Sequence, residues 1–338
     1  MTPPILYSDA IETVPADEEQ DGARLLETLE MLLRFHVEWS GRREREVHVK
    51  SHGSVRGEFH IATDLPPELA QGLFARPRAY PAWVRFSNAS PWPQPDILPD
   101  GRGLAIQLAG VEGETLGRPG LQDFIMVNSP TFLSRDVKDY LRLLQDRLRA
   151  GRNFLQLGAR LLSHFGQPAN WGGLGAALRI AAQIPSHPAA YTYWSMVPFR
   201  FGHFVAKYRV RPARQNLGTI PGMAATFLTD PNAMRRLLSR SLARGELVFE
   251  FQVQLRTSET SMPIEDATVE WPERESPYRT VATLRLPPQA LSAAPDDSVE
   301  ERRSFTVWNA LADHRPLGGI NRSRRLAYAA SARFRNEP

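Results

Sequence analysis

Hydrophobic residues recur along the chain with two different periods, and the changes between them divide it into segments. Leu25, Leu29 and Leu32 lie three or four positions apart, which predicts a helix over residues 21–37. Elsewhere apolar and polar positions alternate, which predicts strands because successive side chains of a strand point to opposite faces. The strands are expected at residues 47–61, with a turn or bulge between Gly53 and Gly57, and at residues 81–88, 100–108, 124–127, 204–210, 247–255 and 280–286.

The helical period dominates the middle and the end of the chain. Asp136 has the residue type of an N-cap, and an apolar face with helical spacing follows it. The glycine-rich run 172–175 fits no nucleotide-binding pattern and predicts a turn. Helices are expected from residue 136, at 155–165, at 174–184, at 232–243 and at 321–335.

This order of segments indicates the fold class. Strands lie on both sides of a helical block, and helices flank the whole set, which predicts one α+β unit. The strands are expected to form an antiparallel barrel or a sandwich, and the pattern alone does not choose between the two. No internal repeat or low-complexity linker interrupts the unit.

Composition narrows the classes of function. The 338 residues are 42% hydrophobic and 23% charged, as in an ordinary globular protein. The absence of cysteine excludes disulfides, thiolate nucleophiles, iron–sulfur clusters and thiolate-ligated haem. A net charge of +4 is too small to predict a nucleic-acid partner. We expect no membrane span, since no apolar run reaches about 18 residues. The N-terminus lacks the pattern of a secretory leader, so a cytoplasmic location is expected.

The predicted last helix carries the first chemically informative pair. Arg324 and Tyr328 lie one turn apart on one face of that helix. A nearby cation favours the phenolate, and a tyrosinate can hold haem iron as an axial ligand. The plainer alternative is a half-buried tyrosine beside a solvated basic tail.

Two further features lie on predicted strands. His48 alternates with Val47 and Val49, so it is expected to point into a core or a cavity. Arg85 and Ser87 share one side of their strand. Each feature taken singly also fits a structural role.

Together these residues form an ordered set of short motifs. They are Arg45-x-x-His48-x-Lys50, Val84-Arg85-Phe86-Ser87, Arg102-Gly103-x-Ala105, Asp123-Phe124 through Asn128-x-Pro130-x-Phe132 to Arg135-Asp136, and Arg324-x-x-x-Tyr328. In order and rough spacing, from about residue 42 to 335, the chain resembles the haem catalases, and most of all their short catalase-related branch. The resemblance implies a catalase-like antiparallel β-barrel with a helical insertion at about 134–200 and a C-terminal proximal helix. It also implies an N-terminal arm (1–40) before a haem-binding domain (41–338).

The same resemblance implies roles for individual residues around haem b. Tyr328 would be the proximal iron ligand, and Arg324 would support its phenolate. His48 would be the distal acid/base, and Ser87 would orient its imidazole. The remaining contacts would come from Arg45, Arg85 and Arg335 to the propionates, Tyr140 on the distal face, and Phe132 in the cavity wall.

One motif departs from the family pattern. When the motif is aligned on Pro130, the distal asparagine of the family falls on Val127, and Asn128 follows one position later. We expect Asn128 to be catalytic only if the strand shifts to bring its amide into the cavity. Without that shift, fast disproportionation of hydrogen peroxide is in doubt.

The functional expectation is a haem peroxidase of catalase type. Its partners would be hydrogen peroxide or an organic hydroperoxide and an unidentified reductant, and it could form a homo-oligomer. One alternative is a haem enzyme that rearranges organic or fatty-acid hydroperoxides, as catalase-like allene oxide synthases do. Another is a non-catalytic barrel that binds haem or an apolar ligand.

Overall fold

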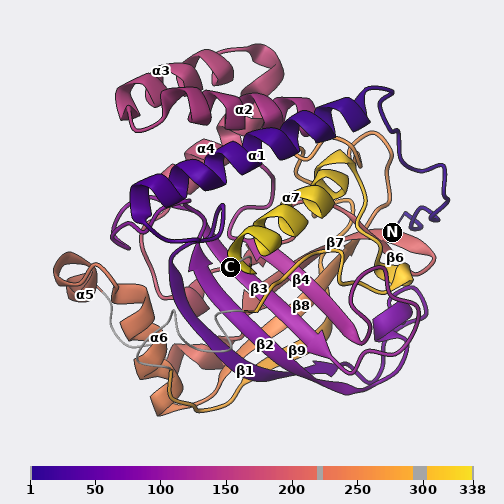
Figure 1. The fold of residues 1–338 in the computed structure, drawn as a ribbon. Coiled ribbons are helices and arrows are strands. Elements are labelled where there is room, and N and C mark those ends of the chain that lie inside the picture. The colour runs from indigo at the N-terminus through magenta and orange to yellow at the C-terminus, as the bar shows by residue number, and fades with distance from the viewer. Residues whose placement is uncertain (1, 219–223, 292–302, 337–338) are drawn as a thin grey trace.

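The computed structural model describes residues 2–218, 224–291 and 303–336, and its centre is a closed antiparallel barrel (Figure 1). The strands follow the order β5-β4-β3-β2-β1-β9-β8-β7, and β5 also pairs with β7, which closes a ring of eight. Strand β6 extends the sheet as a hairpin with β7. The strands are β1 (Ser51–Ile61), β2 (Ala79–Asn88), β3 (Arg102–Ala109), β4 (Leu121–Val127), β5 (Tyr193–Trp194), β6 (Phe199–Phe201), β7 (Phe204–Pro212), β8 (Leu247–Leu255) and β9 (Arg279–Leu286).

Aromatic rings fill the interior of the barrel. The ring of Phe251 lies 5.1 Å from that of Phe59 and 4.7 Å from that of Phe124, measured between centroids. All three side chains are buried. Alternation along each strand therefore sends the neighbouring side chains of β2, β3 and β4 to the outer face.

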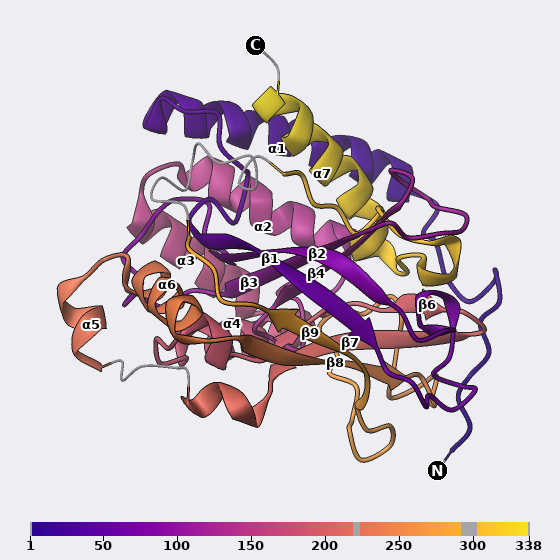
Figure 2. The ribbon, with the colours of Figure 1, turned by 90° about the horizontal axis from the view of Figure 1, so that it is seen from below.

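Helices cover that outer face. Helix α7 packs against α1, and α1 packs against α2, so the three form a layer on one side of the barrel (Figures 1 and 2). The apolar stripe predicted for the first helix, with Leu25 and Leu29, meets Leu141 and Leu144 of α2. The helices of the described residues are α1 (Glu18–Ser40), α2 (Val137–Ala150), α3 (Phe154–Phe165), α4 (Trp171–Ala181), α5 (Ala224–Thr229), α6 (Ala233–Arg244) and α7 (Gly319–Asn336).

Ion pairs fix the start of α7. The Arg322 guanidinium lies 2.6 Å from Glu18 and 3.0 Å from Glu265, and it also pairs with Glu12. These carboxylates come from the N-terminal arm, from α1 and from the segment between β8 and β9. The later turns of α7, which carry Tyr328, are thereby held at a defined place over the barrel.

Three local predictions were wrong. Strand β1 begins at Ser51 and not at residue 47, because the left-handed φ of 60° at His48 interrupts an extended strand. The strand continues through Gly53 and Gly57 without the predicted turn, and its register shift lies between Ser51 and Gly53. The glycine-rich run 172–175 lies inside helix α4 and forms no turn. A Cβ on Gly173 would lie 2.2 Å from the carbonyl oxygen of Leu133, so glycine allows the helix to pack closely there.

Candidate functional site

The outer face of β2, β3 and β4 provides one wall of the candidate site. Ser87 is the cross-strand partner of Gly103, and Gly103 is the partner of Val127. Cross-strand partners point to the same face, so these residues form one row across three strands. A second row on the same face consists of Arg85, Ala105 and Ile125.

His48 lies against the first row. Its Nδ1 is 3.0 Å from the Ser87 hydroxyl oxygen. A Cβ on Gly103 would lie 2.6 Å from the same nitrogen, closer than real Cβ contacts come. The imidazole can therefore lie against the strand only because residue 103 is glycine.

The backbone of His48 is left-handed, whereas the sequence predicted an extended strand at this residue. Its φ is 60°, a value that costs energy in any residue with a Cβ. Three contacts hold this conformation: the backbone N–H donates to the Ala89 carbonyl at 3.2 Å, Arg85 Nη2 donates to the His48 carbonyl at 3.0 Å, and the ring meets Ser87. Strain of this kind persists where the surrounding structure enforces it, as it often does at functional sites.

Burial and nearby cations keep the imidazole of His48 neutral. Burial is the largest cause, followed by the charge of Arg85, and together they lower the pKa of His48 from 6.5 to about 3. The charges of Arg324 and Arg45 act in the same direction. Arg324 belongs to α7, so this helix comes within electrostatic reach of the imidazole. The imidazole is therefore neutral and a weak base at neutral pH, so a proton that it takes up is readily passed on.

Helix α7 carries the second group of predicted site residues. The Arg324 guanidinium lies 6.0 Å from the centre of the Tyr328 ring and donates to Asn321 Oδ1 at 3.3 Å. Tyr328 is partly buried against the main core. The predicted pairing of these two residues on one helix face is confirmed.

Arg335, further along α7, is a cation in a largely buried place. It donates to the hydroxyls of Ser331 at 3.3 Å and Ser304 at 3.1 Å, and within the described part of the chain it pairs with no carboxylate. Burial, and after it the charge of Arg85, lower the pKa of Arg335 to about 10. Arg335 therefore stays charged at neutral pH beside a second arginine. The third predicted arginine, Arg45, donates to the Arg303 carbonyl at 2.9 Å.

Two aromatic side chains lie beside α7. The rings of Phe132 and Tyr140 meet edge to face, with their centroids 5.3 Å apart. Burial is the main cause that raises the pKa of Tyr140, so its hydroxyl stays protonated. The charge of Glu46 raises this pKa further, and the charges of Arg147 and Arg324 lower it.

Val127, and not Asn128, shares the face with His48. The pairing of β3 with β4 continues without a bulge from Leu121 to Val127. Asn128 Oδ1 accepts from the Arg102 backbone N–H at 2.6 Å, and its Nδ2 donates to Gln183. The catalytic role of Asn128 stays a prediction, and both ends of its amide are engaged with residues other than His48.

Sequence reasoning missed two determinants of this geometry. The left-handed backbone of His48 depends on contacts with residues at least 37 positions away, and the sequence carries no local sign of it. The close approach of His48 to Gly103 could have been found from the sequence, since a glycine inside a predicted strand often marks a close contact.

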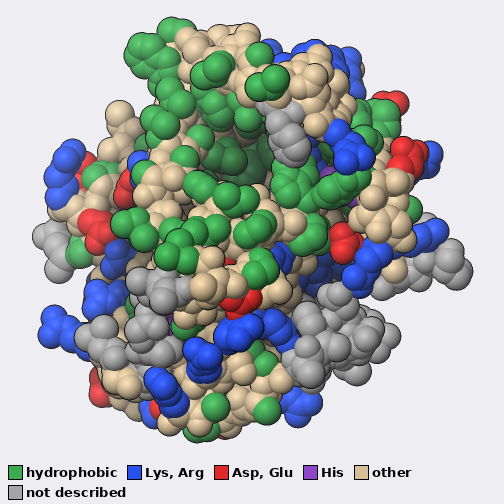
Figure 3. Space-filling view, turned by 90° about the vertical axis from the view of Figure 1, so that its left-hand side faces the viewer, with side chains coloured by type: hydrophobic (Ala, Val, Ile, Leu, Met, Phe, Trp, Pro, Cys, Tyr) green, Lys and Arg blue, Asp and Glu red, His purple; other side chains and the backbone are tan. Residues whose placement is uncertain are grey.

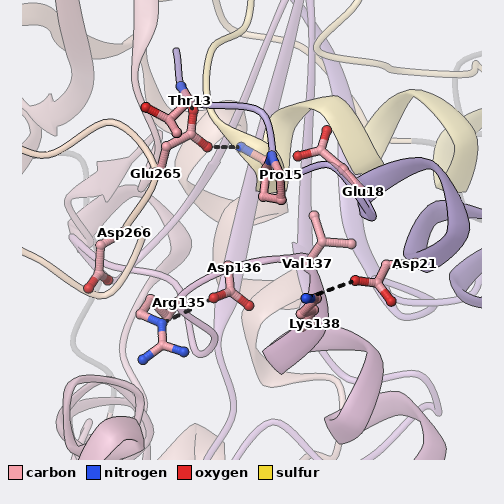
Figure 4. A pocket seen from close by; sticks show the side chains of 11 residues that line it. Thr13, Pro15, Glu18, Asp21, Arg135, Asp136, Val137, Lys138, Glu265 and Asp266 are labelled. Atoms are coloured by element: carbon pink, nitrogen blue, oxygen red, sulfur yellow. Dashed lines mark hydrogen bonds and ion pairs between the residues drawn. The ribbon is translucent and has the colours of Figure 1, made fainter.

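A separate cavity of about 380 Å³ lies at the N-terminal ends of α2 and α7 (Figure 4). Its charged side chains are already used within the protein: Arg135 pairs with Asp136 at 3.1 Å, and Glu265 accepts from the Thr13 and Gly319 backbone N–H groups. None of the predicted site residues lines it. We therefore regard this cavity as structural and place the candidate site at His48 and Tyr328.

No protein-family model matches the sequence, and no curated protein matches it. Solved catalase structures do match the fold. Catalase A from Saccharomyces cerevisiae superposes with a TM-score of 0.71 at 16% identity, covering 89% of this chain and 63% of that one. A fungal catalase superposes with a TM-score of 0.69 at 17% identity, covering 90% of this chain and 61% of that one. A bacterial catalase superposes with a TM-score of 0.68 at 20% identity, covering 98% of this chain and 64% of that one.

These likenesses confirm the predicted fold, a catalase-like antiparallel barrel with a helix at its C-terminal end. The chain spans less than two thirds of the length of each of the three catalases. At such low identity the likeness concerns the fold alone.

Proposed function

We propose that this protein is a haem b-dependent, peroxide-processing enzyme of the short catalase-related kind. His48 would be its distal acid/base and Tyr328 its proximal iron ligand. The observation that carries the proposal is the neutral imidazole of His48, which Ser87 and Arg85 hold in a strained conformation and which feels the charge of Arg324, one turn from Tyr328 on α7.

The residues present fit a flat, anionic cofactor. Gly103 leaves the space in which the imidazole lies, and the wall beside it consists of the small or apolar side chains Ala105, Ile125 and Val127. Arg335 is a buried cation whose described partners are hydroxyl groups, so a propionate would supply its missing counter-charge. Arg45 and Arg85 would take part in the same contacts.

Haem supplies the redox chemistry when it is bound, and an anionic phenolate ligand increases electron density at the iron. Arg324 favours that phenolate through its positive charge. The protonated hydroxyl of Tyr140 and the ring of Phe132 would pack on the cofactor from the side of α2.

His48 performs the proton chemistry in this proposal. A hydroperoxide must lose a proton at one oxygen and gain one at the other as its O–O bond breaks. The neutral imidazole can take the first proton and return it to the second oxygen. Ser87 keeps the ring in the orientation that this transfer requires.

Val127 favours peroxidase-type turnover over disproportionation of hydrogen peroxide. An amide at this position would give a small peroxide a second hydrogen-bonding partner beside His48. A valine offers only apolar contact, so a second hydrogen peroxide molecule is held poorly. An external reductant would then complete the cycle.

The apolar wall also supports a second candidate function, the rearrangement of an organic hydroperoxide. Ala105, Ile125 and Val127 form a surface suited to an alkyl chain. The two functions differ in their products: the first consumes a reductant, whereas the second converts a lipid hydroperoxide without one. A ligand inside the barrel is not favoured, because aromatic rings fill that space.

Absorption spectra of the haem-loaded protein and two variants test the proposal. Tyr328→Phe removes the ligand oxygen and should abolish or strongly weaken haem retention. His48→Ala should retain haem while the rate of the peroxide-driven spectral change falls by about a hundredfold. Tyr7→Phe and His60→Ala, which alter side chains outside the site, are the controls. Normal peroxide turnover in the His48 variant would contradict the mechanism.

A further inference from the structure

A β-bulge near the start of β1 carries a second buried histidine. The pairing of β1 with β2 shifts in register between Ser51 and Gly53, so His52 is the extra residue of the bulge. Bulges of this kind redirect a side chain and are frequent beside active sites. The bulge therefore places a second imidazole in the segment that also holds His48.

The imidazole of His52 donates a hydrogen bond to the side chain of Asn88. Its Nε2 lies 2.7 Å from Asn88 Oδ1, and the Arg102 guanidinium donates to the same oxygen. A guanidinium can only donate, so the shared atom is the amide oxygen, and His52 Nε2 must carry the proton. Burial is the largest cause that lowers the pKa of His52 to about 4, so Nδ1 carries no proton at pH 7. That nitrogen lies 3.9 Å from Asp96, which is too far for a hydrogen bond.

Exposed apolar side chains and this buried polar cluster differ in their access to solvent. Figure 3 shows hydrophobic side chains around a hollow on one face of the molecule, and within the described ranges no helix is long and apolar enough to cross a membrane. His52, Asn88 and Asp96 are enclosed instead, with exposed fractions of 1%, 0% and 0%. Bulk water cannot replace a lost partner in such a place, so each hydrogen bond of the cluster determines where its neighbours lie.

Asn88 links this cluster to the imidazole of His48. Burial lowers the pKa of His48 most, and a hydrogen bond with the Asn88 backbone acts in the opposite direction. A bond that raises the pKa of an imidazole is one in which the ring donates, so the acceptor is the Asn88 carbonyl. Ser87, the preceding residue, contacts the same ring through its hydroxyl. Two consecutive residues of β2 therefore orient the imidazole.

We propose that His52 is a positioning residue for His48 and acts through Asn88. Together with Arg102 it fixes Asn88, and the Asn88 carbonyl then holds one N–H group of the His48 ring. The ring thereby keeps one tautomer and one orientation. The catalytic part of this inference rests on the proposed function, whereas the link between the two histidines does not depend on haem.

Replacements of His52 separate the contact with Asn88 from the filling of space. His52→Gln places an amide nitrogen where Nε2 lies, so it can still donate to Asn88. His52→Asn places its amide nitrogen at the level of Nδ1, on the side of Asp96, and His52→Leu fills the space without a donor. The control is His187→Leu, which removes another buried imidazole, one that bonds with the Ser241 hydroxyl at 2.9 Å.

NMR of the haem-free full chain with ¹⁵N-labelled histidine tests the link directly. The ¹⁵N shifts of a ring show which nitrogen carries the proton, and His48→Gln identifies the signals of His48. In the native chain and in His52→Gln we expect a single tautomer of His48. In His52→Leu and His52→Asn the tautomers should average, and the ring N–H should exchange about tenfold faster because its hydrogen bond is weakened. His187→Leu should leave the signals of His48 unchanged.

The haem-loaded variants test the consequence for the reaction. The rate of the peroxide-driven spectral change should fall about tenfold in His52→Leu and His52→Asn, since a shift well below 1 Å costs less than a hundredfold. His52→Gln should stay near the native rate. If His52→Leu does not fold, His52→Gln and His52→Asn decide between them, because both retain an amide.

Native His48 signals in His52→Leu and His52→Asn would overturn the inference. Equal changes in His52→Gln or in His187→Leu would also overturn it, because the contact with Asn88 would then not be the cause. A native chain that takes up no haem would instead overturn the proposed function and the catalytic part of this inference, and the signals of His48 would still decide whether His52 acts on that ring.

Discussion

At the scale of single residues, the contact between Gly103 and His48 sets the position of the imidazole that we propose as the acid/base group. Any side chain at residue 103 would have its Cβ 2.6 Å from the imidazole nitrogen and 2.7 Å from the Ser87 hydroxyl. Both groups would have to move, and neither is the flexible end of a long side chain. The strained backbone of His48 leaves little freedom to follow.

Gly103→Ala should therefore damage the reaction more than the fold. A displacement of about 1 Å can cost about a hundredfold in rate, and we expect a loss of that order in peroxide-driven turnover with haem still bound. Stopped-flow spectroscopy of the haem-loaded variant measures it. Gly175→Ala, where an added Cβ meets nothing within 4 Å, is the control. An unaltered rate in Gly103→Ala would show that His48 does not act from this position.

Val127 allows a gain-of-function test at the same scale. Val127→Asn would place an amide on the row that contains Ser87 and Gly103, where the peroxide is proposed to bind. We expect oxygen release from hydrogen peroxide to rise about tenfold, the effect of one added hydrogen bond worth about 1.4 kcal/mol. Val127→Ala, which removes the methyl groups without adding an amide, should not produce this gain. An oxygen electrode measures the rate of oxygen release. Equal rates in Val127→Asn and Val127→Ala would contradict the role given to Val127.

At the scale of elements, the ion-pair cluster around Arg322 determines where α7 lies. Its guanidinium is shared by Glu12, Glu18 and Glu265, and the side chain is 14% exposed. Removing the cation leaves three carboxylates in a partly buried place without a counter-charge. Such a loss is far costlier than the loss of a surface pair.

Arg322→Gln should lower the free energy of unfolding by about 3 kcal/mol, the lower end of the range for breaking a buried pair. It should also weaken haem retention, because α7 carries Tyr328. Urea denaturation measures the first effect and haem titration the second. Arg333→Gln, at an exposed residue of the same helix, should change neither. A stable variant with normal haem retention would show that α7 is positioned by other contacts.

The strands differ in how well the sequence predicts them. Longer strands such as β8 follow alternation over their whole length, and the predicted range 247–255 is confirmed. Strands β5 and β6, with two and three residues, are too short to show any period. The start of β1 follows the left-handed backbone of His48, which Ser87 and Arg85 hold from another strand and which a local pattern cannot contain.

For the candidate site, residue types and motif order led us to predict His48, Ser87 and the pair on α7, and the structure brings His48 to Ser87 and Arg324 to Tyr328. Their geometry required tertiary contacts. Gly103 and Arg85 act on His48 from other strands, and the face taken by Val127 depends on the absence of a bulge in β4. The residue types alone indicate which chemical groups are present, whereas the positions of these groups follow from pairing between distant segments of the chain.

At the scale of the whole molecule, buried histidines link stability to pH. His52, His187 and His314 are fully enclosed, and each forms hydrogen bonds inside the protein. Burial is the largest cause that lowers the pKa of each from 6.5 to about 4. Below about pH 6.5 the unfolded chain therefore binds protons at these positions that the folded protein does not bind.

The free energy of unfolding should consequently fall as the pH drops from about 6.5 toward 4, because stability decreases wherever the unfolded state binds more protons. Asp123 and Asp100 act in the opposite direction, since burial raises the pKa of both carboxyls, that of Asp123 to about 7, and the folded state takes up these protons first. His36 and His48, whose pKa values burial also lowers, add to the three histidines, so two carboxyl groups against five imidazoles leave a net loss in acid. Urea denaturation at pH 7.5, 6 and 5 measures the slope, and His60→Gln, at a histidine that is only partly buried, should leave the slope unchanged. Stability that stays level or rises toward pH 5 would mean that the three imidazoles are protonated inside the fold, which their apolar surroundings oppose.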